Sequence, residues 1–239
     1  MKYVEQVPEW LAQKIVCRPQ SVWSIMNVLR TSAIRMGRPV HKALRGQKLA
    51  LFFRLVGASS KSTLLDIGGG TGIDSEFVPL YRAFQNVTVV NLTPPQSELC
   101  SLPNVRHEIA DGCRLPYESK SFDWVFSNAV LEHVGSAERQ RQFSDEIRRV
   151  ARCGYFVTTP NKSFPIEPHS LLPFYQFLSE SWQRRVVHFS PYYLDHYEEI
   201  RLVYANQLRQ MFPEAHIRSI GFPIVGTSLV AMFKDPKYV

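Results

Sequence analysis

Short apolar runs alternate with helical patterns along the chain from Ser62 onward. Five runs rich in β-branched and other apolar residues fit buried strands, at Ser62–Gly68, Asn86–Leu92, Val105–Ala110, Phe122–Asn128 and Cys153–Pro160. Between them, the segments around Asp74–Phe84 and Ala137–Ala151 have helical spacing. This alternation predicts an α/β fold in which helices cover both faces of a parallel sheet.

The two ends of the chain depart from this pattern. Ala215–Pro223 and Thr227–Lys234 are strand-like runs joined by a turn, which predicts an antiparallel hairpin at the sheet edge. Residues 1–60 instead predict a helical N-terminal cap, ahead of a main domain over residues 61–239. Helical spacing there is carried by Val22, Met26 and Leu29, and by Leu44, Leu51, Phe52 and Leu55.

The segment at about 162–212 interrupts the strands and is rich in aromatic residues. We expect a helical insertion whose aromatic side chains pack mainly as core, because packing is the commoner role of such residues. An insertion after the fifth strand also lies on the ligand side of the sheet. We therefore interpret it as a lid, with some aromatic rings turned inward.

Charge and composition narrow the class of protein. Apolar residues make up 45% of the chain and charged residues 21%, which is typical of a globular protein. No long apolar run or signal-peptide pattern is present, so we expect a cytoplasmic protein. The four cysteines lack CxxC spacing, so the sequence predicts neither a zinc site nor a disulfide framework.

The formal charge of +7 is concentrated in residues 1–60, which contain ten Lys or Arg and two Glu. Three roles stay open for this segment. It is a solvated face, or a surface that contacts anionic membrane or a phosphate-bearing acceptor, or a nucleic-acid surface. Nucleic acid is the least favoured because no recognition motif accompanies the charge.

Four glycines follow the first predicted strand: Gly68, Gly69, Gly70 and Gly72. Glycine lets the backbone turn tightly and approach a ligand, and the helix that follows offers free N–H groups. The dinucleotide pattern GxGxxG requires a third glycine at position 73, which is Ile73. A nicotinamide oxidoreductase is accordingly a weaker interpretation.

The spacing Asp66-x-Gly68-x-Gly70-x-Gly72, together with "LPYESKSFDWVF" at residues 115–126, resembles the class I S-adenosylmethionine-dependent methyltransferases. The resemblance covers most of residues 62–160 and is to the methyltransferase type 11-like group of quinone and small-molecule enzymes. It implies a Rossmann-like, doubly wound, seven-stranded, mainly parallel sheet. It also implies S-adenosylmethionine as cofactor and S-adenosylhomocysteine as product.

The resemblance assigns cofactor contacts residue by residue. Asn91 stands where the family usually has Asp or Glu for the ribose, and Asp111 stands where a carboxylate accepts from the adenine amino group. An amide offers one acceptor and two donors and can still bond the ribose. The full set implied to bind the cofactor is Asp66, Gly68, Gly69, Gly70, Gly72, Asn91, Leu92, Asp111, Gly112 and Asn128.

Two histidines are candidate proton acceptors. Methyl transfer is an in-line displacement, and a histidine can remove the proton of an acceptor hydroxyl. His133 follows the fourth predicted strand, and His169 lies in the proline-rich stretch after the fifth. Asn161, Glu167 and His169 are candidate acceptor-binding residues. A purely structural role stays open for His133 and for this loop.

The fourth strand ends in Ser127-Asn128-Ala129-Val130 and lacks the Pro-Pro motif of enzymes that methylate nucleic-acid bases. The sequence therefore favours methyl transfer to oxygen of a small-molecule, glycan or lipid-linked acceptor. The alternative is a catalytically inactive binding or scaffold protein that keeps the methyltransferase fold.

Overall fold

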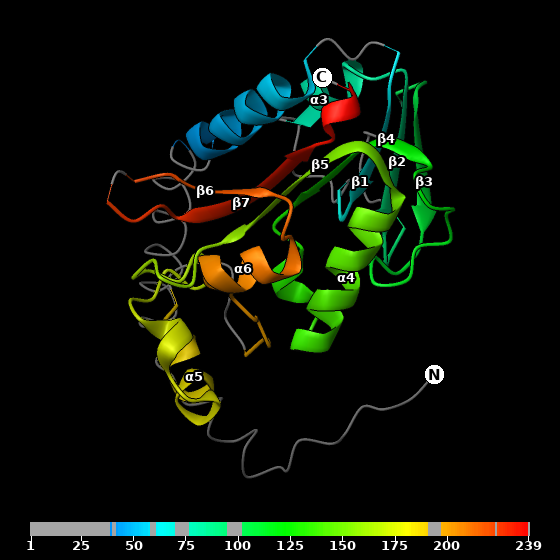
Figure 1. The fold of residues 1–239 in the computed structure, drawn as a ribbon. Coiled ribbons are helices and arrows are strands. Elements are labelled where there is room, and N and C mark those ends of the chain that lie inside the picture. Colours follow the sequence, from blue (N-terminus) through cyan, green and yellow to red (C-terminus); the bar gives the residue numbers. More distant parts are fainter. Residues whose placement is uncertain are drawn as a thin grey trace, which may run out of the picture.

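Seven strands form one sheet in the part of the chain that the computed structural model describes, in the order β3-β2-β1-β4-β5-β7-β6 (Figure 1). The strands are β1 (Thr63–Ile67), β2 (Asn86–Asn91), β3 (Val105–Ile109), β4 (Phe122–Asn128), β5 (Ala151–Pro160), β6 (His216–Ile220) and β7 (Ser228–Lys234). The structure describes residues 39, 42–57, 61–69, 77–94, 102–190, 197–222 and 224–238.

Strands β1 to β5 run parallel, and β7 pairs antiparallel with both β5 and β6. The predicted doubly wound, mainly parallel sheet with an antiparallel C-terminal hairpin is thereby confirmed. Strand order reverses between β1 and β4, and ligands of such sheets bind beyond the carboxyl ends of the strands at that point.

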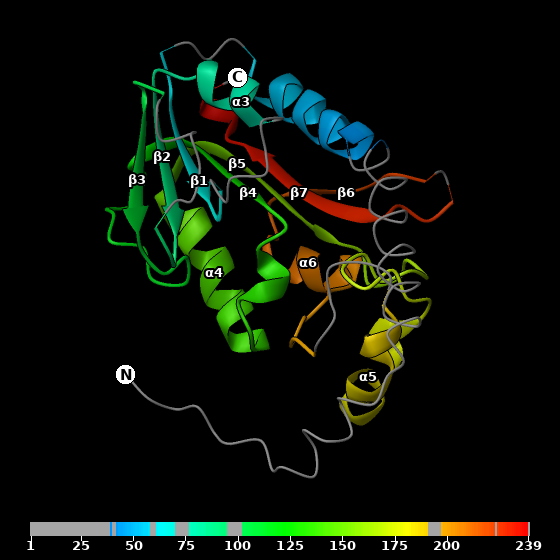
Figure 2. The same ribbon diagram turned by 180° about the vertical axis from the view of Figure 1, so that it is seen from behind.

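Helices cover both faces of the sheet (Figure 2). On one face lie α4 (Ala137–Val150) and α6 (Ala205–Met211), whose apolar residues pack with Leu65 and Val125. On the other lie α3 (Val78–Arg82) and a helix over residues 42–56, which pack with Leu64 and Trp124. Neighbouring strand residues therefore face opposite layers, so continuous apolar runs are needed in the strands.

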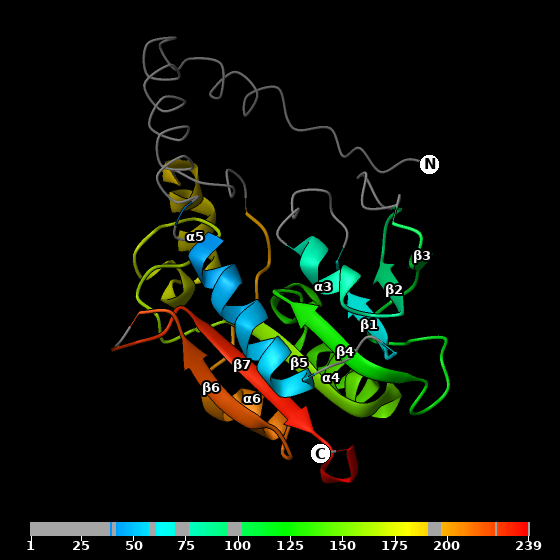
Figure 3. The same cartoon turned by 90° about the horizontal axis from the view of Figure 1, so that it is seen from above.

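The helix over residues 42–56 confirms the helical pattern expected from Leu44 to Leu55. Its Phe52 is fully buried, and its ring lies 5.2 Å from that of Phe126 and 5.5 Å from that of Phe156. Figure 3 shows this helix lying along the sheet. The rest of the predicted cap, including Val22, Met26 and Leu29, lies outside the described residues.

The segment after β5 contains η4 (Tyr175–Phe177), α5 (Glu180–Val186), η5 (Val187–Phe189) and α6. The expectation that its aromatic residues pack mainly as core is wrong for the described residues. Tyr175 is buried, but Phe174, Phe177, Trp182 and Phe189 are 48% to 65% exposed. Phe177, Trp182 and Phe189 lie on η4, α5 and η5, which are elements of one or two turns, and α5 buries no residue.

No helix among the described residues combines the length and the apolar character that crossing a membrane requires.

Candidate functional site

The glycine turn after β1 is shaped by close contacts. Gly68 has φ +83°, and a Cβ added there would lie 2.3 Å from Cγ2 of Val130. A Cβ on Gly69 would lie 2.1 Å from Oδ2 of Asp66. Any side chain at either position would collide with its surroundings, so the turn requires glycine. Gly70 and Gly72 lie outside the described residues.

Asp66 supports this turn from below. Its side chain is buried, and Oδ2 accepts a hydrogen bond of 2.5 Å from the Tyr81 hydroxyl. Asp66 therefore lies under the turn, within the protein core, and is not among the residues that line the adjacent cavity.

A cavity of about 340 Å³ opens at the carboxyl ends of β1, β2, β3 and β4. It brings together five of the residues predicted to bind the cofactor, and one predicted proton acceptor. These are Gly68, Asn91, Leu92, Asp111, Gly112 and His133. The volume is within the usual range of small-molecule sites.

Asn91 ties the end of β2 to the glycine turn. Its Nδ2 donates to the carbonyl of Gly69 at 3.3 Å, and its Oδ1 accepts from the backbone N–H of Leu92 at 2.8 Å. The Leu92 side chain is 68% exposed and gives this wall of the cavity an apolar surface. The asparagine thus has a structural task besides the predicted ribose contact.

Asp111 is held by an arginine that sequence reasoning missed. Nη2 of Arg139 lies 3.0 and 2.9 Å from the two carboxylate oxygens, and the Cys113 N–H donates to Oδ1 at 2.9 Å. Burial raises the pKa of Asp111, but these hydrogen bonds and the charge of Arg139 outweigh it and lower the pKa below 3.8. The group is therefore an anion at neutral pH and can accept further hydrogen bonds.

Packing explains why Gly112 is glycine, since an added Cβ would lie 2.7 Å from the Phe143 ring. Asn128 is not among the residues that line the cavity. Its Oδ1 accepts from Nζ of Lys48 at 2.9 Å and from Oγ1 of Thr158 at 2.8 Å. Asn128 thereby joins the helix over residues 42–56 to β4 and β5, and its predicted cofactor contact stays a prediction.

The two predicted histidines lie against each other. The rings of His133, in η3 (Leu131–His133), and of His169 meet edge to face with centroids 5.0 Å apart. Each ring has a carboxylate on Nδ1: Oε1 of Glu167 lies 2.6 Å from His169, and Oε1 of Glu198 lies 3.2 Å from His133. The chain thus brings the end of β4 and the loop after β5 together beside the cavity.

Glu167 and Asn161 organise the loop that carries His169. The carboxylate of Glu167 is 2% exposed and accepts from the backbone N–H groups of His169 and Ser170. Asn161 is buried, donates to the Gly226 carbonyl and accepts from the Ser163 N–H. Both side chains are engaged by protein groups, and their predicted acceptor contacts stay predictions.

Glu167 and His169 each shift the pKa of the other. Burial lowers the pKa of His169 and raises that of Glu167, but their hydrogen bond and mutual attraction outweigh burial. The pKa of His169 is therefore raised above 6.5, and the pKa of Glu167 is lowered below 4.5. Glu132 and Glu198 add to the rise at His169.

We expect the Glu167–His169 pair to stabilise the fold fully between pH 4.5 and pH 6.5, which are the ordinary pKa values of glutamate and histidine. A raised histidine pKa gives stability that is lost as pH rises through it, and a lowered carboxyl pKa gives stability that is lost as pH falls through it. The difference in free energy of unfolding between wild type and His169→Gln, from urea titrations, should peak in that window. An exposed-histidine control, His216→Gln, should show no such peak; a flat difference for His169→Gln would contradict the pairing.

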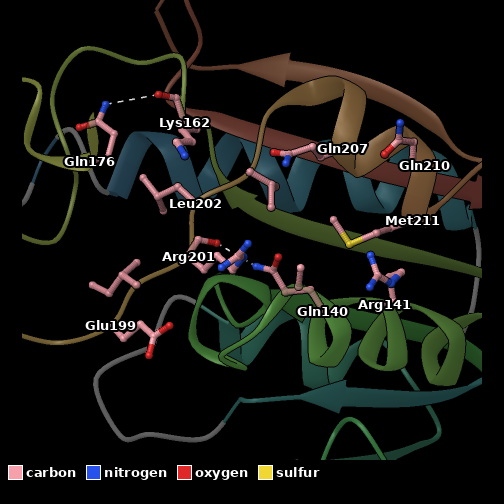
Figure 4. Close-up of a pocket in the computed structure, with 13 residues that line it drawn as sticks. Gln140, Arg141, Lys162, Gln176, Glu199, Arg201, Leu202, Gln207, Gln210 and Met211 are labelled. Carbon is pink, nitrogen blue, oxygen red and sulfur yellow. Dashed lines mark hydrogen bonds between the residues drawn. The ribbon is translucent and has the colours of Figure 1, made fainter. Parts of the chain in front are cut away.

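A second cavity, also of about 340 Å³, lies between α4, α6 and the segment at 199–203 (Figure 4). Its lining is mainly amide and charged, with Gln140, Arg141, Lys162 and Gln207 among its residues. Gln140 donates to the carbonyls of Leu131 and Arg201 and so braces the segment behind η3. None of the predicted site residues is among those that line this cavity.

The glycine turn and its cavity fall within a recognised domain. Residues 65–158 match the family model described as a methyltransferase domain. Over this stretch the chain is similar to methyltransferase domains. The match begins in β1 and ends in β5, so the matched region includes Asp66, Asn91, Asp111 and His133 but not His169. No curated protein sequence matches the chain.

Solved structures share the fold of this chain at low sequence identity. A SAM dependent methyltransferase from Aquifex aeolicus has a TM-score of 0.52 and 14% identity over 85% of this chain and 96% of its own. For a Pyrococcus horikoshii protein the values are 0.55 and 16%, over 85% and 90%. For the magnesium protoporphyrin IX methyltransferase of Synechocystis, solved with bound SAH, they are 0.53 and 12%, over 82% and 83%.

Proposed function

We propose that the protein transfers the methyl group of S-adenosylmethionine to an oxygen atom of a small-molecule, glycan or lipid-linked acceptor, in the cytoplasm. The observation that carries this proposal is the glycine turn, where a Cβ at Gly68 would meet Val130 in the wall of the cavity. A backbone without side chains suits close approach by a polar ligand.

The cavity residues fit the parts of the cofactor. Gly68 would receive the amino-acid tail, and Asp111 would accept from the adenine amino group while Leu92 contacts the apolar ring face. The bound cofactor supplies an electrophilic methyl group. The protein's own contribution is to orient the acceptor at about 3–3.5 Å and to exclude water.

An oxygen acceptor is supported by the histidine pair. A hydroxyl needs a group that takes its proton, and His133 lines the same cavity as Gly68. Oε1 of Glu198 contacts Nδ1 of this ring and orients the imidazole, which leaves Nε2 available to the hydroxyl of the methyl acceptor. The exposed aromatic rings after β5 would suit an apolar, lipid-linked or glycosidic acceptor.

Calorimetry with S-adenosylhomocysteine tests the proposal. We expect one site with a dissociation constant in the micromolar range or tighter, and no comparable binding of NAD. Asp111→Ala should weaken binding about 10-fold to 100-fold, because a hydrogen bond to a charged group contributes about 1.5–3 kcal/mol. Asp145→Ala, an exposed aspartate on α4, is the matched control and should bind normally.

The outcomes separate the candidate functions. A folded wild-type protein that does not bind the cofactor product would exclude the proposed activity. Binding without transfer of labelled methyl groups to any fraction of a cell extract would favour the inactive, fold-retaining binding protein. Transfer to an extract component identifies the acceptor class directly.

A further inference from the structure

Three potential metal-ligating side chains converge beside the glycine-turn cavity. Glu132 and His133 come from η3, and His169 comes from the loop after β5. One carboxylate oxygen of Glu132 and one ring nitrogen of each histidine lie within 4.8 Å of one another. Groups that are far apart in the sequence thus meet at one point.

Glu132 is the unusual member of this cluster. Its side chain is fully buried, and Oε2 accepts from Oγ1 of Thr159 at 3.0 Å. Its Oε1 is also buried but finds no hydrogen-bond partner among the described residues. Burying a carboxylate oxygen without a hydrogen-bond partner costs free energy. A bound ligand that contacts Oε1 would offset this cost.

Both imidazoles are arranged as metal ligands usually are. Glu167 on Nδ1 of His169 and Glu198 on Nδ1 of His133 favour the tautomer with the proton on Nδ1. That tautomer leaves the lone pair on Nε2. Outer carboxylates of this kind fix the ring orientation and increase the basicity of a ligating histidine.

We propose that Glu132, His133 and His169 bind a divalent transition-metal ion of the zinc class, through the carboxylate and the two Nε2 atoms. Two histidines and one glutamate form a three-ligand set that leaves a coordination position open. Ligands of a tetrahedral zinc ion lie about 3.4 Å apart, and the three ligand atoms lie within 4.8 Å of one another, so side-chain shifts of at most about 1 Å would bring them to that spacing.

This inference goes beyond methyl transfer and does not depend on it, because metal binding needs neither cofactor nor acceptor. A coordinated imidazole cannot also accept a proton. In a metal-loaded protein the open position would therefore receive an oxygen donor, whereas in a metal-free protein the imidazoles would act as hydrogen-bond partners.

The test uses untagged, chelator-treated full-length protein titrated with Zn²⁺ by calorimetry and with Co²⁺ by absorption spectroscopy. We expect one ion per chain at micromolar affinity or tighter, and a Co²⁺ spectrum without the intense thiolate charge-transfer band that cysteine ligands produce. Bound Zn²⁺ should also raise the unfolding temperature.

Variants locate the site. Glu132→Gln keeps the shape of the side chain and should weaken Zn²⁺ binding at least 10-fold, and His169→Ala should do the same. Glu167→Gln, which changes only the positioning of His169, should weaken it about 10-fold to 100-fold. His216→Ala, an exposed histidine on β6, is the control and should bind like wild type.

Absence of binding at 100-fold molar excess of Zn²⁺, or undiminished affinity in folded Glu132→Gln and His169→Ala proteins, would overturn the proposal. Neither result would bear on S-adenosylhomocysteine binding, so failure of the metal site is distinguishable from failure of the proposed activity.

Discussion

Replacing Gly68 by alanine should weaken S-adenosylhomocysteine binding about 100-fold. The new Cβ would lie 2.3 Å from Cγ2 of Val130, and φ +83° is a conformation that L side chains rarely adopt. Either the turn or the neighbouring cavity wall must move, and both changes displace the backbone that would receive the cofactor. Calorimetry measures the affinity, and thermal unfolding establishes that the variant is folded.

A second substitution isolates the cause of this loss. Val130→Ala in the Gly68→Ala background removes the colliding methyl group and should recover part of the affinity. Gly46→Ala is the matched control, because a Cβ at Gly46 meets nothing within 4 Å and helical alanine is favoured over glycine. Wild-type affinity in folded Gly68→Ala protein would show that the turn does not form the cofactor site.

Replacing His133 by alanine should lower turnover about 100-fold or more while S-adenosylhomocysteine affinity holds, as expected when a proton acceptor is lost. The ring lines the cavity, contacts His169 and is oriented by Glu198. The measurement is initial velocity at saturating cofactor with the acceptor identified from the labelled extract.

Two controls test whether the loss of turnover is specific to His133 and independent of a metal ion. His216→Ala should retain wild-type turnover, since that histidine is exposed on β6. Chelator-treated wild type should also remain active if His133 acts as the proton acceptor without a metal. Turnover of His133→Ala within about threefold of wild type would assign the residue a structural role.

The strands could be predicted because each is marked by its own run of apolar residues. Runs such as Phe122–Asn128 are buried on both faces, and that burial requires the apolar sequence by which they are recognised. Prediction of β5 began two residues late, since α4 passes into the strand at Ala151 without a loop. The prediction for the aromatic segment was wrong because α5 buries no residue and the rings of Phe177, Trp182 and Phe189 on η4, α5 and η5 are exposed.

The candidate site was only partly predictable. Gly68 and Asp111 closely follow strands, so the sequence predicts their position at the cavity. Arg139 on α4 contacts Asp111, and Glu198 contacts His133 across 65 residues. Because these partners are far apart in the sequence, no local residue spacing predicts either contact. The burial of Glu132 has no sequence signal either, because a Glu-His pair at a helix start is usually solvated.

The helix over residues 42–56 shows that the start of the family match and the start of the folding unit are different positions in the chain. The recognisable family pattern starts at Leu65, yet Phe52 fills the layer against Phe126 and Phe156, and Lys48 bonds Asn128 at the end of β4. The smallest autonomous folding unit therefore starts well upstream of the recognisable pattern. A fragment cut at that pattern would present bare aromatic rings to water and would be prone to self-association.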